Sequence, residues 1–332
     1  MAPTASARPS TETAPHAGLA RLRRQHRQDV AFRGVTWFFA VVVFTTLAAI
    51  LISLAIGSVP AFKAFGPGFL TSTEWNPVTN QYGAAIAIFG TVVTSLIALV
   101  IGIPISFGIA LFLTELSPPA LKRPLGTAIE LLAAVPSIIY GMWGLLVFAP
   151  LFAEYVQPLL SATLGNTWLI APLFEGAPNG IGILTAGLIL SCMVIPFIAS
   201  VMRDVFEIVP PVLKESAYGV GATTWEVVWN VVLPYTKVGV IGGIMLGFGR
   251  ALGETMAVTF VIGNAHRISS SLYSAGNSIA STLANEFAEA SHDLHLSALI
   301  ALGLILFMIS FVVLACAKLL LVRLAKQEGR KT

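Results

Sequence analysis

Charged residues are scarce in this chain of 332 residues. Asp, Glu, Lys and Arg make up 11% of it, whereas a typical soluble domain carries about 25%. Hydrophobic residues make up 56% and the mean hydropathy is +0.85. The few charges leave uncharged runs at 34–62, 75–114, 131–153, 176–202 and 296–317. Each run exceeds the roughly 20 residues that cross a hydrocarbon core, so the composition excludes a soluble globular protein.

Cysteine is almost absent, and so are several motifs of enzymes. Cys192 and Cys316 both fall in apolar stretches, which excludes an external disulfide framework. No Lys follows a Gly, so the chain has no phosphate-binding loop of the Walker A type. An HExxH metal motif, a nucleophile with a neighbouring base and a pair of intramembrane Asp residues are also missing. An intramembrane enzyme is therefore disfavoured.

The apolar runs predict an all-α, polytopic membrane protein. Lipid cannot satisfy an open strand edge, and the alternation of a membrane barrel is lacking. A sixth apolar stretch is interrupted only by Arg250 and Glu254. The six predicted spans are Trp37–Ile56, Ile86–Leu113, Ala128–Pro150, Ile181–Met202, Val238–Ile262 and Ser297–Leu321. The apolar run after the polar first 33 residues is too long for a signal peptide, which predicts an uncleaved anchor.

Most basic residues lie in segments on one side of the membrane when the six predicted spans alternate in direction. Segments on the side of the termini hold 16 Lys and Arg, and segments on the other side hold only Lys63 and Arg267. The positive-inside rule therefore predicts cytoplasmic termini. The predicted parts are an N-terminal tail 1–33, a transmembrane domain 34–322 with a cytoplasmic loop 203–237, and a C-terminal tail 323–332. The pI of about 8.9 then reflects topology, and no nucleic-acid partner is expected.

The predicted outer face is acidic. It carries six Asp and Glu against two basic residues, a net charge of −4. Such a face does not concentrate anions from the medium. An anionic substrate would need to be delivered by another protein.

The fifth predicted span carries the strongest candidate site. Ionisable groups inside a membrane are costly and mark functional sites, and Arg250 and Glu254 are four residues apart, on one face of a continuous helix. The glycines of that face, which predict close helix packing, are Gly239, Gly243 and Gly247. The two charges either neutralise each other or line a substrate pathway. A guanidinium with five donors suits a tetrahedral oxyanion well.

The loop 203–237 is too long for a simple connection. Pro210 and Pro211 predict the start of a helix that Lys214–Tyr218 continues, with a break at Gly219 and Gly221. Thr223 and Glu226 form a capping-box pattern that opens a second helix, Trp225–Val232, which Pro234 is expected to close. The apolar residues of this helix indicate either docking on a cytoplasmic partner or packing against the bundle.

The run from Glu215 to Pro234 resembles the EAA loop of bacterial ABC-importer permeases. The matching residues are Glu215, Ala217, Gly221, Leu233 and Pro234, while Ser216 replaces an Ala and Val231 an Ile. This resemblance implies the EAA-type permease fold. It also implies a separate dimeric ATPase into which the loop inserts, so that this chain is a non-catalytic transport subunit with no cofactor of its own.

Three further segments narrow the resemblance. ELLAAVPSIIYGMWGL (130–145), GRALGETMAVTFVIGN (249–264) and GNSIASTLANEFAEA (276–290) look like segments of the C subunits of high-affinity phosphate importers, the Pst systems. The resemblance implies a bacterial inner-membrane permease for inorganic phosphate that works by alternating access. The implied partners are a second, homologous permease subunit, the ATPase dimer, an extracytoplasmic phosphate-binding protein and membrane lipid.

Two other functions and one metal site are weighed against a phosphate permease. A permease for sulfate or molybdate fits the same residues, because selectivity also depends on the binding protein. An ion-coupled carrier or channel fits Arg250 and Glu254 but does not explain the loop spacing. His292, Asp293 and His295 could suggest a metal site, but a solvated or capping role is favoured and no metal is expected.

Overall fold

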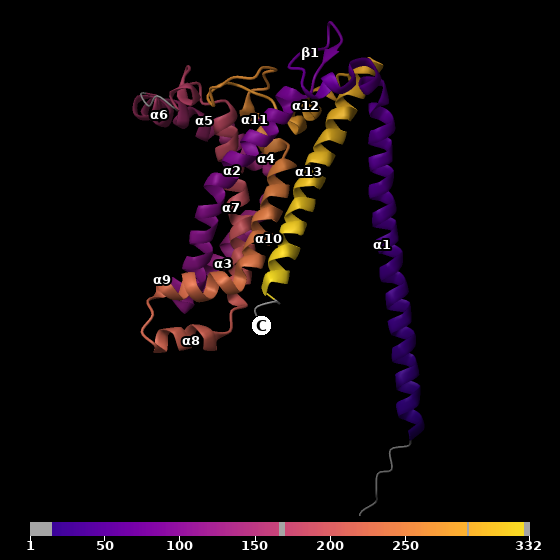
Figure 1. Ribbon diagram of the computed structural model, residues 1–332, viewed down its shortest axis with the longest axis vertical. Helices are drawn as coiled ribbons and strands as arrows, with labels where there is room; N and C mark the ends of the chain where they lie inside the picture. Colours follow the sequence, from indigo (N-terminus) through magenta and orange to yellow (C-terminus); the bar gives the residue numbers. More distant parts are fainter. Residues whose placement is uncertain (1–14, 166–169, 291, 329–332) are drawn as a thin grey trace, which may run out of the picture. The chain divides into compact units, whose positions relative to one another are not determined.

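The computed structural model describes residues 15–165, 170–290 and 292–328 and is almost entirely helical (Figure 1). Six helical segments are long and apolar enough to cross a membrane: Gln28–Leu70, Ala85–Leu116, Ser137–Leu164, Ile183–Glu207, Thr224–Leu252 and Asp293–Arg323. The predicted all-α protein with six spans is confirmed. Of the predicted tails 1–33 and 323–332, residues 1–14 and 329–332 lie outside the described residues.

The chain divides into two compact units, Met1–Ser53 and Leu54–Thr332. The first unit contains the N-terminal part of helix α1 (Pro15–Phe65). Its apolar side chains, such as Phe38 at 60% exposure, point away from the helix on all sides. A helix that is apolar all round is typical of a membrane span. Helix α1 is much longer than the span predicted at 37–56.

The second unit contains all the other elements. Those before the central helix are η1 (Gly66–Leu70), β1 (Trp75–Asn76), β2 (Gln81–Tyr82), α2 (Ala85–Leu111), η2 (Phe112–Leu116), α3 (Pro119–Ala133), α4 (Ser137–Trp143), η3 (Gly144–Phe148), α5 (Ala149–Leu151), η4 (Phe152–Val156), α6 (Gln157–Leu164) and η5 (Ala171–Phe174). The central helix and those after it are α7 (Ile183–Glu207), α8 (Pro211–Gly219), α9 (Thr224–Val227), η6 (Val228–Val232), α10 (Leu233–Leu252), α11 (Met256–Ile262), α12 (Ile279–Glu286) and α13 (Asp293–Glu328). Strands β1 and β2 pair antiparallel, with Trp75 opposite Tyr82.

Helix α7 forms the centre of this unit. Two thirds of its most apolar window is buried, the largest share of the six candidate spans. It packs against α2 at Gly187, where a Cβ would lie 2.5 Å from the Ile97 side chain. Its buried residues Ile189, Leu190 and Met193 belong to a core shared with α2, α10 and α11. A second core joins the hairpin of β1 and β2 to α12 and α13 through Tyr82, Phe69 and other residues.

The prediction of one third span at 128–150 is wrong in its boundaries. Helix α3 ends at Ala133 and α4 begins at Ser137. Pro136 lies between them and disfavours helical backbone at the residue before it. The candidate span then runs to Leu164 through segments with π-type hydrogen bonds.

The prediction of a continuous fifth helix at 238–262 is also wrong. Helix α10 ends at Leu252, and α11 begins only at Met256. Gly253 caps the first segment, and α11 ends at Gly263, whose φ of +92° is a left-handed conformation that suits glycine. The span is therefore a discontinuous helix.

Pro234 does not close a helix as predicted. The π segment η6 leads directly from α9 into α10, in which Pro234 is at one of the first two positions. Proline is tolerated in the first turn, and π segments relieve the backbone clash that it would cause in a regular helix. The loop helix and the fifth span are thus one helical rod from Thr224 to Leu252.

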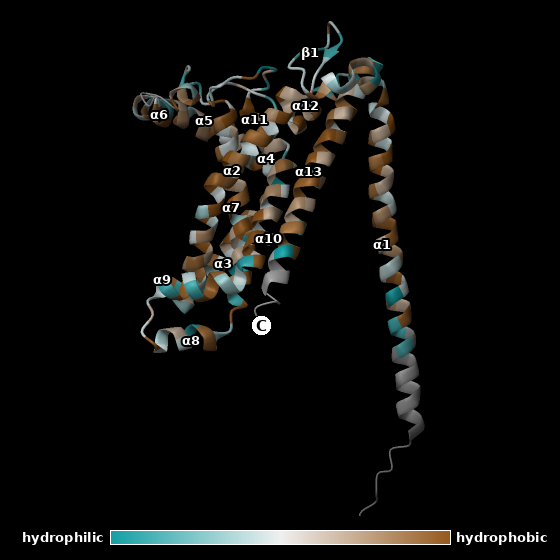
Figure 2. Ribbon diagram, viewed as in Figure 1, coloured by the Kyte–Doolittle hydropathy of each residue, from teal (hydrophilic) through white to brown (hydrophobic). Residues whose placement is uncertain are grey.

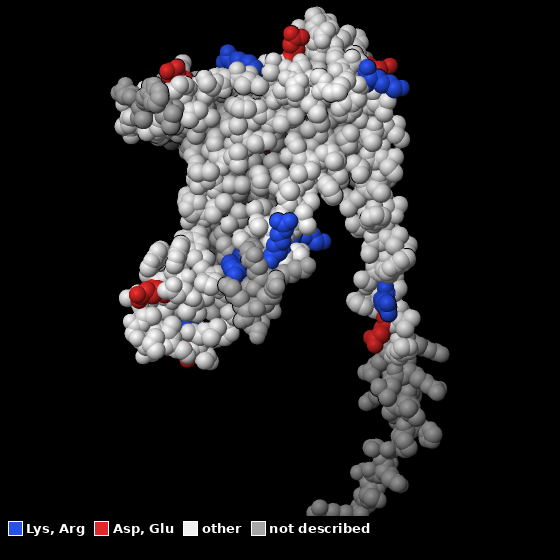
Figure 3. Space-filling model, in the orientation of Figure 1, with Lys and Arg blue, Asp and Glu red and all other residues white. Residues whose placement is uncertain are grey.

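Hydropathy and charge follow this arrangement. Helices α8 and α9 lie at one end of the second unit, and β1 and α12 lie at the opposite end (Figure 1). The helices between these ends are mostly apolar (Figure 2). Charged side chains on the visible face of the unit gather towards its two ends (Figure 3). The pattern agrees with a protein that spans a bilayer.

Candidate functional site

Arg250 lies two residues before the end of α10, beside the helix break. Its guanidinium carbon is 5.3 Å from the ring centroid of Phe197 on α7. Its Nε atom is buried without a hydrogen-bond partner among the described residues. A cation over an aromatic ring gains roughly 0.5–2 kcal/mol. The ring supports the charge, while Nε keeps an N–H donor without an acceptor among the described residues.

Glu254 does not neutralise Arg250 in the described structure. It lies in the break, and its Oε1 accepts a hydrogen bond of 3.3 Å from the backbone N–H of Ala257 in α11. Because the helix stops at Leu252, Glu254 no longer shares the α10 face that a continuous helix would have given it. The side chain of Glu254 is directed to the start of α11 instead.

Arg250 and the three glycines of α10 face α7. A Cβ at Gly239 would lie 2.5 Å from Val205, one at Gly243 would lie 3.0 Å from Val201, and one at Gly247 would lie 2.5 Å from Ile198. Any side chain at these positions would force the two helices apart. This contact holds α10 against the helix that carries Phe197.

The helix break packs against the other broken span. At Gly141 of α4, a Cβ would lie 2.7 Å from Phe260 and 3.0 Å from the Cα of Ala257, both on α11. Tyr140 on the same helix interacts electrostatically with Arg250 and donates a 3.0 Å hydrogen bond to the carbonyl of Leu132. Two interrupted helices therefore meet next to the Arg250 guanidinium.

The coupling loop, residues 203–237, has the local structure that its sequence predicts in its first part. Helix α8 begins at Pro211, as predicted, and Gly221 has a φ of +90°. The capping box is confirmed: Thr223 accepts from the Glu226 backbone N–H, and the Glu226 carboxylate accepts from the N–H of Thr223 at 2.8 Å. Lys214 is tied to Glu115 in η2 by an ion pair of 2.5 Å.

One face of the coupling loop packs inward and the other is exposed. Ala217 and Leu233 pack against the main core, whereas Pro234, Glu215 and Gly221 are exposed. The rings of Trp225 and Trp229 stack 5.4 Å apart and are 63% and 55% exposed. Large exposed aromatic residues are typical of interaction sites. Packing against the bundle is therefore confirmed for the buried side of the second helix, and docking of its exposed side on a cytoplasmic partner stays a prediction.

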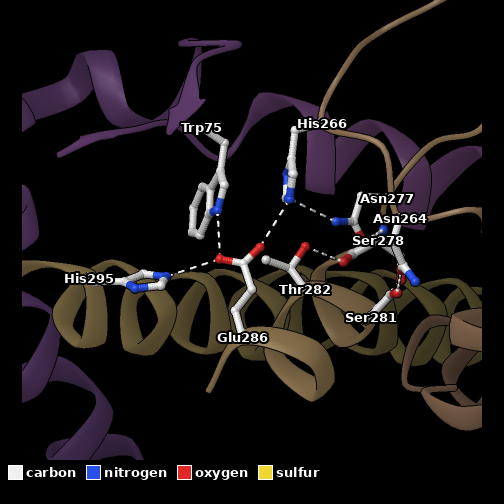
Figure 4. Close-up of polar contacts among 9 residues, drawn as sticks. All are labelled: Trp75, Asn264, His266, Asn277, Ser278, Ser281, Thr282, Glu286 and His295. Atoms are coloured by element: carbon white, nitrogen blue, oxygen red, sulfur yellow. Dashed lines mark hydrogen bonds and ion pairs between the residues drawn. The ribbon is translucent and has the colours of Figure 1, made fainter. Parts of the chain in front are cut away.

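A polar cluster at the opposite end was missed by the sequence analysis (Figure 4). The Glu286 carboxylate, at the end of α12, accepts hydrogen bonds from three segments that are distant in sequence. Its Oε2 receives the Trp75 indole N–H at 2.8 Å and lies 3.0 Å from Nε2 of His295, and its Oε1 lies 3.0 Å from Nε2 of His266. The three partners come from β1, α13 and the loop after α11.

Aromatic contacts complete the cluster. The ring of His266 stacks on Trp75 and the ring of His295 stacks on Tyr82, with centroids 5.8 and 5.2 Å apart. Burial raises the pKa of Glu286, but the hydrogen bonds from His266, Trp75 and His295 outweigh it, so the pKa is lowered overall. Burial and the charge of Glu286 raise the pKa of Tyr82. The carboxylate is thus ionised at neutral pH.

The favoured solvated or capping role of His295 is wrong, because its side chain is buried and bonded to Glu286. No sequence signal joins residues 75, 266, 286 and 295, since helix and strand periodicity report only local neighbours. Within the described residues, no group of three or more His, Cys, Asp or Glu side chains has the geometry of a metal site.

Sequence comparison places these features in a known class. Residues 102–326 match the family described as binding-protein-dependent transport system inner membrane component. A bacterial ABC transporter involved in the import of the polysaccharide alginate has a similar fold, with a TM-score of 0.53 and 18% identity over 91% of this chain and 99% of that one. The fold, the six spans and the EAA-type loop define a permease subunit of an ABC importer.

Closer relatives identify the branch of this family. The chain is 62% identical over 306 residues to "Phosphate transport system permease protein PstC" of Pasteurella multocida, covering 92% of this chain and 95% of the relative. It is 54% identical over 310 residues to the protein of the same name from Mesorhizobium japonicum, covering 93% and 95%. The chain belongs to the PstC family of permease proteins.

Proposed function

We propose that this chain is the permease subunit that carries inorganic phosphate across the bacterial inner membrane in an ATP-driven importer. The names of its relatives in the PstC family support phosphate as the substrate. The observation that carries the site is Arg250, whose Nε is buried without a hydrogen-bond partner among the described residues and whose guanidinium lies over the ring of Phe197. A charged group inside a membrane is costly without a counter-charge, and an anion crossing the membrane would supply one.

Each group beside the helix break has a separate task in this proposal. Arg250 offers planar N–H donors to an oxyanion as the anion loses water. Phe197 holds the guanidinium by its ring face and competes for no donor. Glu254, fixed to the start of α11, places a negative charge close to the path, which limits how tightly an anion binds and so permits release.

The break itself gives the site freedom to change between states. Alternating access needs a segment that moves between two arrangements around a fixed site. Helices α10 and α11 are joined only by residues 253–255, so α11 can tilt while α10 stays packed on α7. Movement of α11 would shift Glu254 relative to Arg250 and change the strength of anion binding.

The coupling loop supports the partners of this proposal. An ATPase dimer would receive the exposed face of α8 and α9, including Glu215, Trp225 and Trp229. A second, homologous permease subunit would complete the pathway, and an extracytoplasmic phosphate-binding protein would deliver the anion to the acidic outer end. The uneven distribution of Lys and Arg between the two sides of the membrane supports placing both termini and the coupling loop in the cytoplasm.

The test is uptake by the reconstituted complex of this chain, the second permease, the ATPase and the binding protein. Uptake of radioactive phosphate should require ATP and stop in the Arg250→Gln variant. The second candidate is a permease for another oxyanion that would use the same guanidinium. Strong competition of phosphate uptake by sulfate or molybdate would support that candidate. Phosphate uptake by this chain alone, without ATP and the ATPase, would support the carrier or channel and overturn the proposal.

A further inference from the structure

Glu286 connects elements that the backbone leaves separate. Its carboxylate is the shared acceptor for Trp75, His266 and His295, and its side chain is only 17% exposed. In Figure 4 these three side chains converge on the two carboxylate oxygens from different segments. A hydrogen bond to a charged acceptor is shorter and stronger than one between neutral groups. Losing this carboxylate would therefore release several segments at once.

Two imidazoles and an indole surround the carboxylate. The ionisable groups that face Glu286 in the described contacts are His266, His295 and the phenol of Tyr82, with the neutral indole of Trp75. No Lys or Arg is among these contacts. Glu286 therefore depends on the side chains of Trp75, His266 and His295 for its stabilisation.

His266 connects Glu286 to α11, because it contacts the carboxylate and lies in the loop that follows α11. The loop that carries it is fixed to the end of α11 by backbone hydrogen bonds from Gly276 N–H to the Ile262 carbonyl at 3.0 Å and from Ala265 N–H to the Gly276 carbonyl at 2.9 Å. Asn264, between α11 and His266, accepts a 2.6 Å hydrogen bond from Ser281 of α12. Helix α11 is thereby held at its end by α12.

His295 connects Glu286 to α13 and β2 and not to α11. It lies in the first turn of α13, and its ring stacks on Tyr82 of β2. Neither of these residues is in α11 or in the loop after it. The two histidines thus bond to the same carboxylate but connect it to different helices.

We propose that Glu286 is a positioning residue of the transport cycle, which through His266 fixes the end of α11 and so the helix break in which Glu254 lies. The inference rests on the proposed function for its link to transport, but its structural part does not depend on the substrate. Helix α11 has only seven residues and starts two residues after Glu254. Freedom at one end of so short a helix reaches the other end within about 11 Å.

The structural test is hydrogen exchange of the assembled complex, read from the backbone amides of 259–265. His266→Gln and Glu286→Gln should each speed this exchange by about tenfold, the factor for about 1.4 kcal/mol of lost stabilisation. His295→Gln should instead speed exchange in the first turn of α13 and leave 259–265 unchanged. Glu289→Gln is the matched control, because Glu289 is an exposed acid on the same segment and should change neither region.

His266→Gln removes one contact of the carboxylate and keeps the others. Exchange of 259–265 can therefore be measured in this variant even if the Glu286→Gln variant assembles poorly. Equal effects of His266→Gln and His295→Gln on 259–265, or no effect of His266→Gln, would overturn the proposal. Exchange needs no substrate, so this result stands even if the complex carries another anion.

The functional test uses ATP-driven uptake per amount of assembled complex, with the KM for phosphate measured separately from the maximal rate. Glu286→Gln should lower the maximal rate several-fold and leave the KM nearly unchanged, because an amide oxygen is a weaker acceptor than a carboxylate and the residue touches no substrate. Glu286→Asp, which keeps the charge on a shorter side chain, should recover part of the rate. A Glu286→Gln variant with the maximal rate of the natural protein would contradict the positioning role.

Discussion

The guanidinium of Arg250 lies over the ring of Phe197, 5.3 Å from its centroid, while Glu254 bonds to the backbone of α11 instead. The two charged residues, four apart in sequence, therefore belong to different helical segments. Each has its own support, so removing one does not leave the other as half of a broken ion pair. This separation gives distinct expectations for the single and double variants.

Arg250→Gln should abolish phosphate uptake while the complex still assembles, because the anion loses its guanidinium partner. Glu254→Gln should be milder and change release or apparent affinity. The double Gln variant should resemble Arg250→Gln. These effects are measured as uptake per amount of assembled complex. Full transport by the double variant would instead indicate a self-neutralising pair and remove Arg250 as an anion site.

Phe197→Leu tests the support of the guanidinium. The substitution removes the ring face but keeps an apolar side chain of similar length, with an expected loss of roughly 0.5–2 kcal/mol in the placement of the charge. Uptake should fall several-fold without being lost. Phe248→Leu, on α10 and packed against the same core, is the matched control and should transport normally. Equal loss in both variants would indicate a general packing defect.

Gly221→Val should uncouple ATP hydrolysis from transport. A β-branched residue at a φ of +90° strains the turn by about 1–3 kcal/mol and displaces α8 relative to α9. Gly219→Val is the control, because a Cβ there meets no atom within 4 Å and the backbone is not left-handed. The ratio of phosphate transported to ATP hydrolysed should drop only for Gly221→Val. An unchanged ratio would refute the coupling role of this turn.

Single cysteines test the orientation, in a background where Cys192 and Cys316 are replaced. Thr73 and Ser270 are exposed at the hairpin end of the second unit, and Val220 is 87% exposed in the coupling loop. In sealed right-side-out cells, an impermeant thiol reagent should label cysteines at the first two positions and not at Val220. Labelling at Val220 alone would reverse the predicted topology.

The lowered pKa of Glu286 predicts how the outer cluster responds to acid. A carboxyl group with a lowered pKa in the folded state stabilises it above the unfolded pKa, about 4.3 for Glu, and the contribution is lost as the pH falls through the folded value. The difference in thermal stability between the natural chain and Glu286→Gln should persist at pH 5 and shrink below about pH 4. A difference that is constant from pH 7 to pH 3 would contradict an ionised carboxylate.

Local rules predicted much of this protein from its sequence. Long apolar runs located all six spans, the proline pair located the start of α8, and the pattern of Thr223 and Glu226 gave the capping box. The glycine spacing placed Gly239, Gly243 and Gly247 on one face, which is the face that contacts α7. Each of these features depends on residues within a few turns of one another.

Features set by tertiary packing were not predictable in this way. Apolar composition is the same on both sides of residues 253–255, so hydropathy could not show the break that separates α10 from α11. Pro234 is a strong helix breaker in a local rule, yet the π segment before it lets the helix continue. The partners of Glu286 lie up to 211 residues away in sequence, beyond the reach of any periodicity.

The uninterrupted rod from Thr224 to Leu252 also fixes the direction in which Arg250 points about the helix axis. Arg250 is 26 residues from the start of the rod, so its direction is set by every residue between the coupling loop and the membrane interior. One residue inserted in 228–232 would turn Arg250 by about 100° away from α7 and advance it by about 1.5 Å. An insertion of seven residues would restore the direction to within about 20° but displace it by about 10 Å. The length between the start of α9 and the guanidinium is therefore as constrained as the identity of the residues at either end.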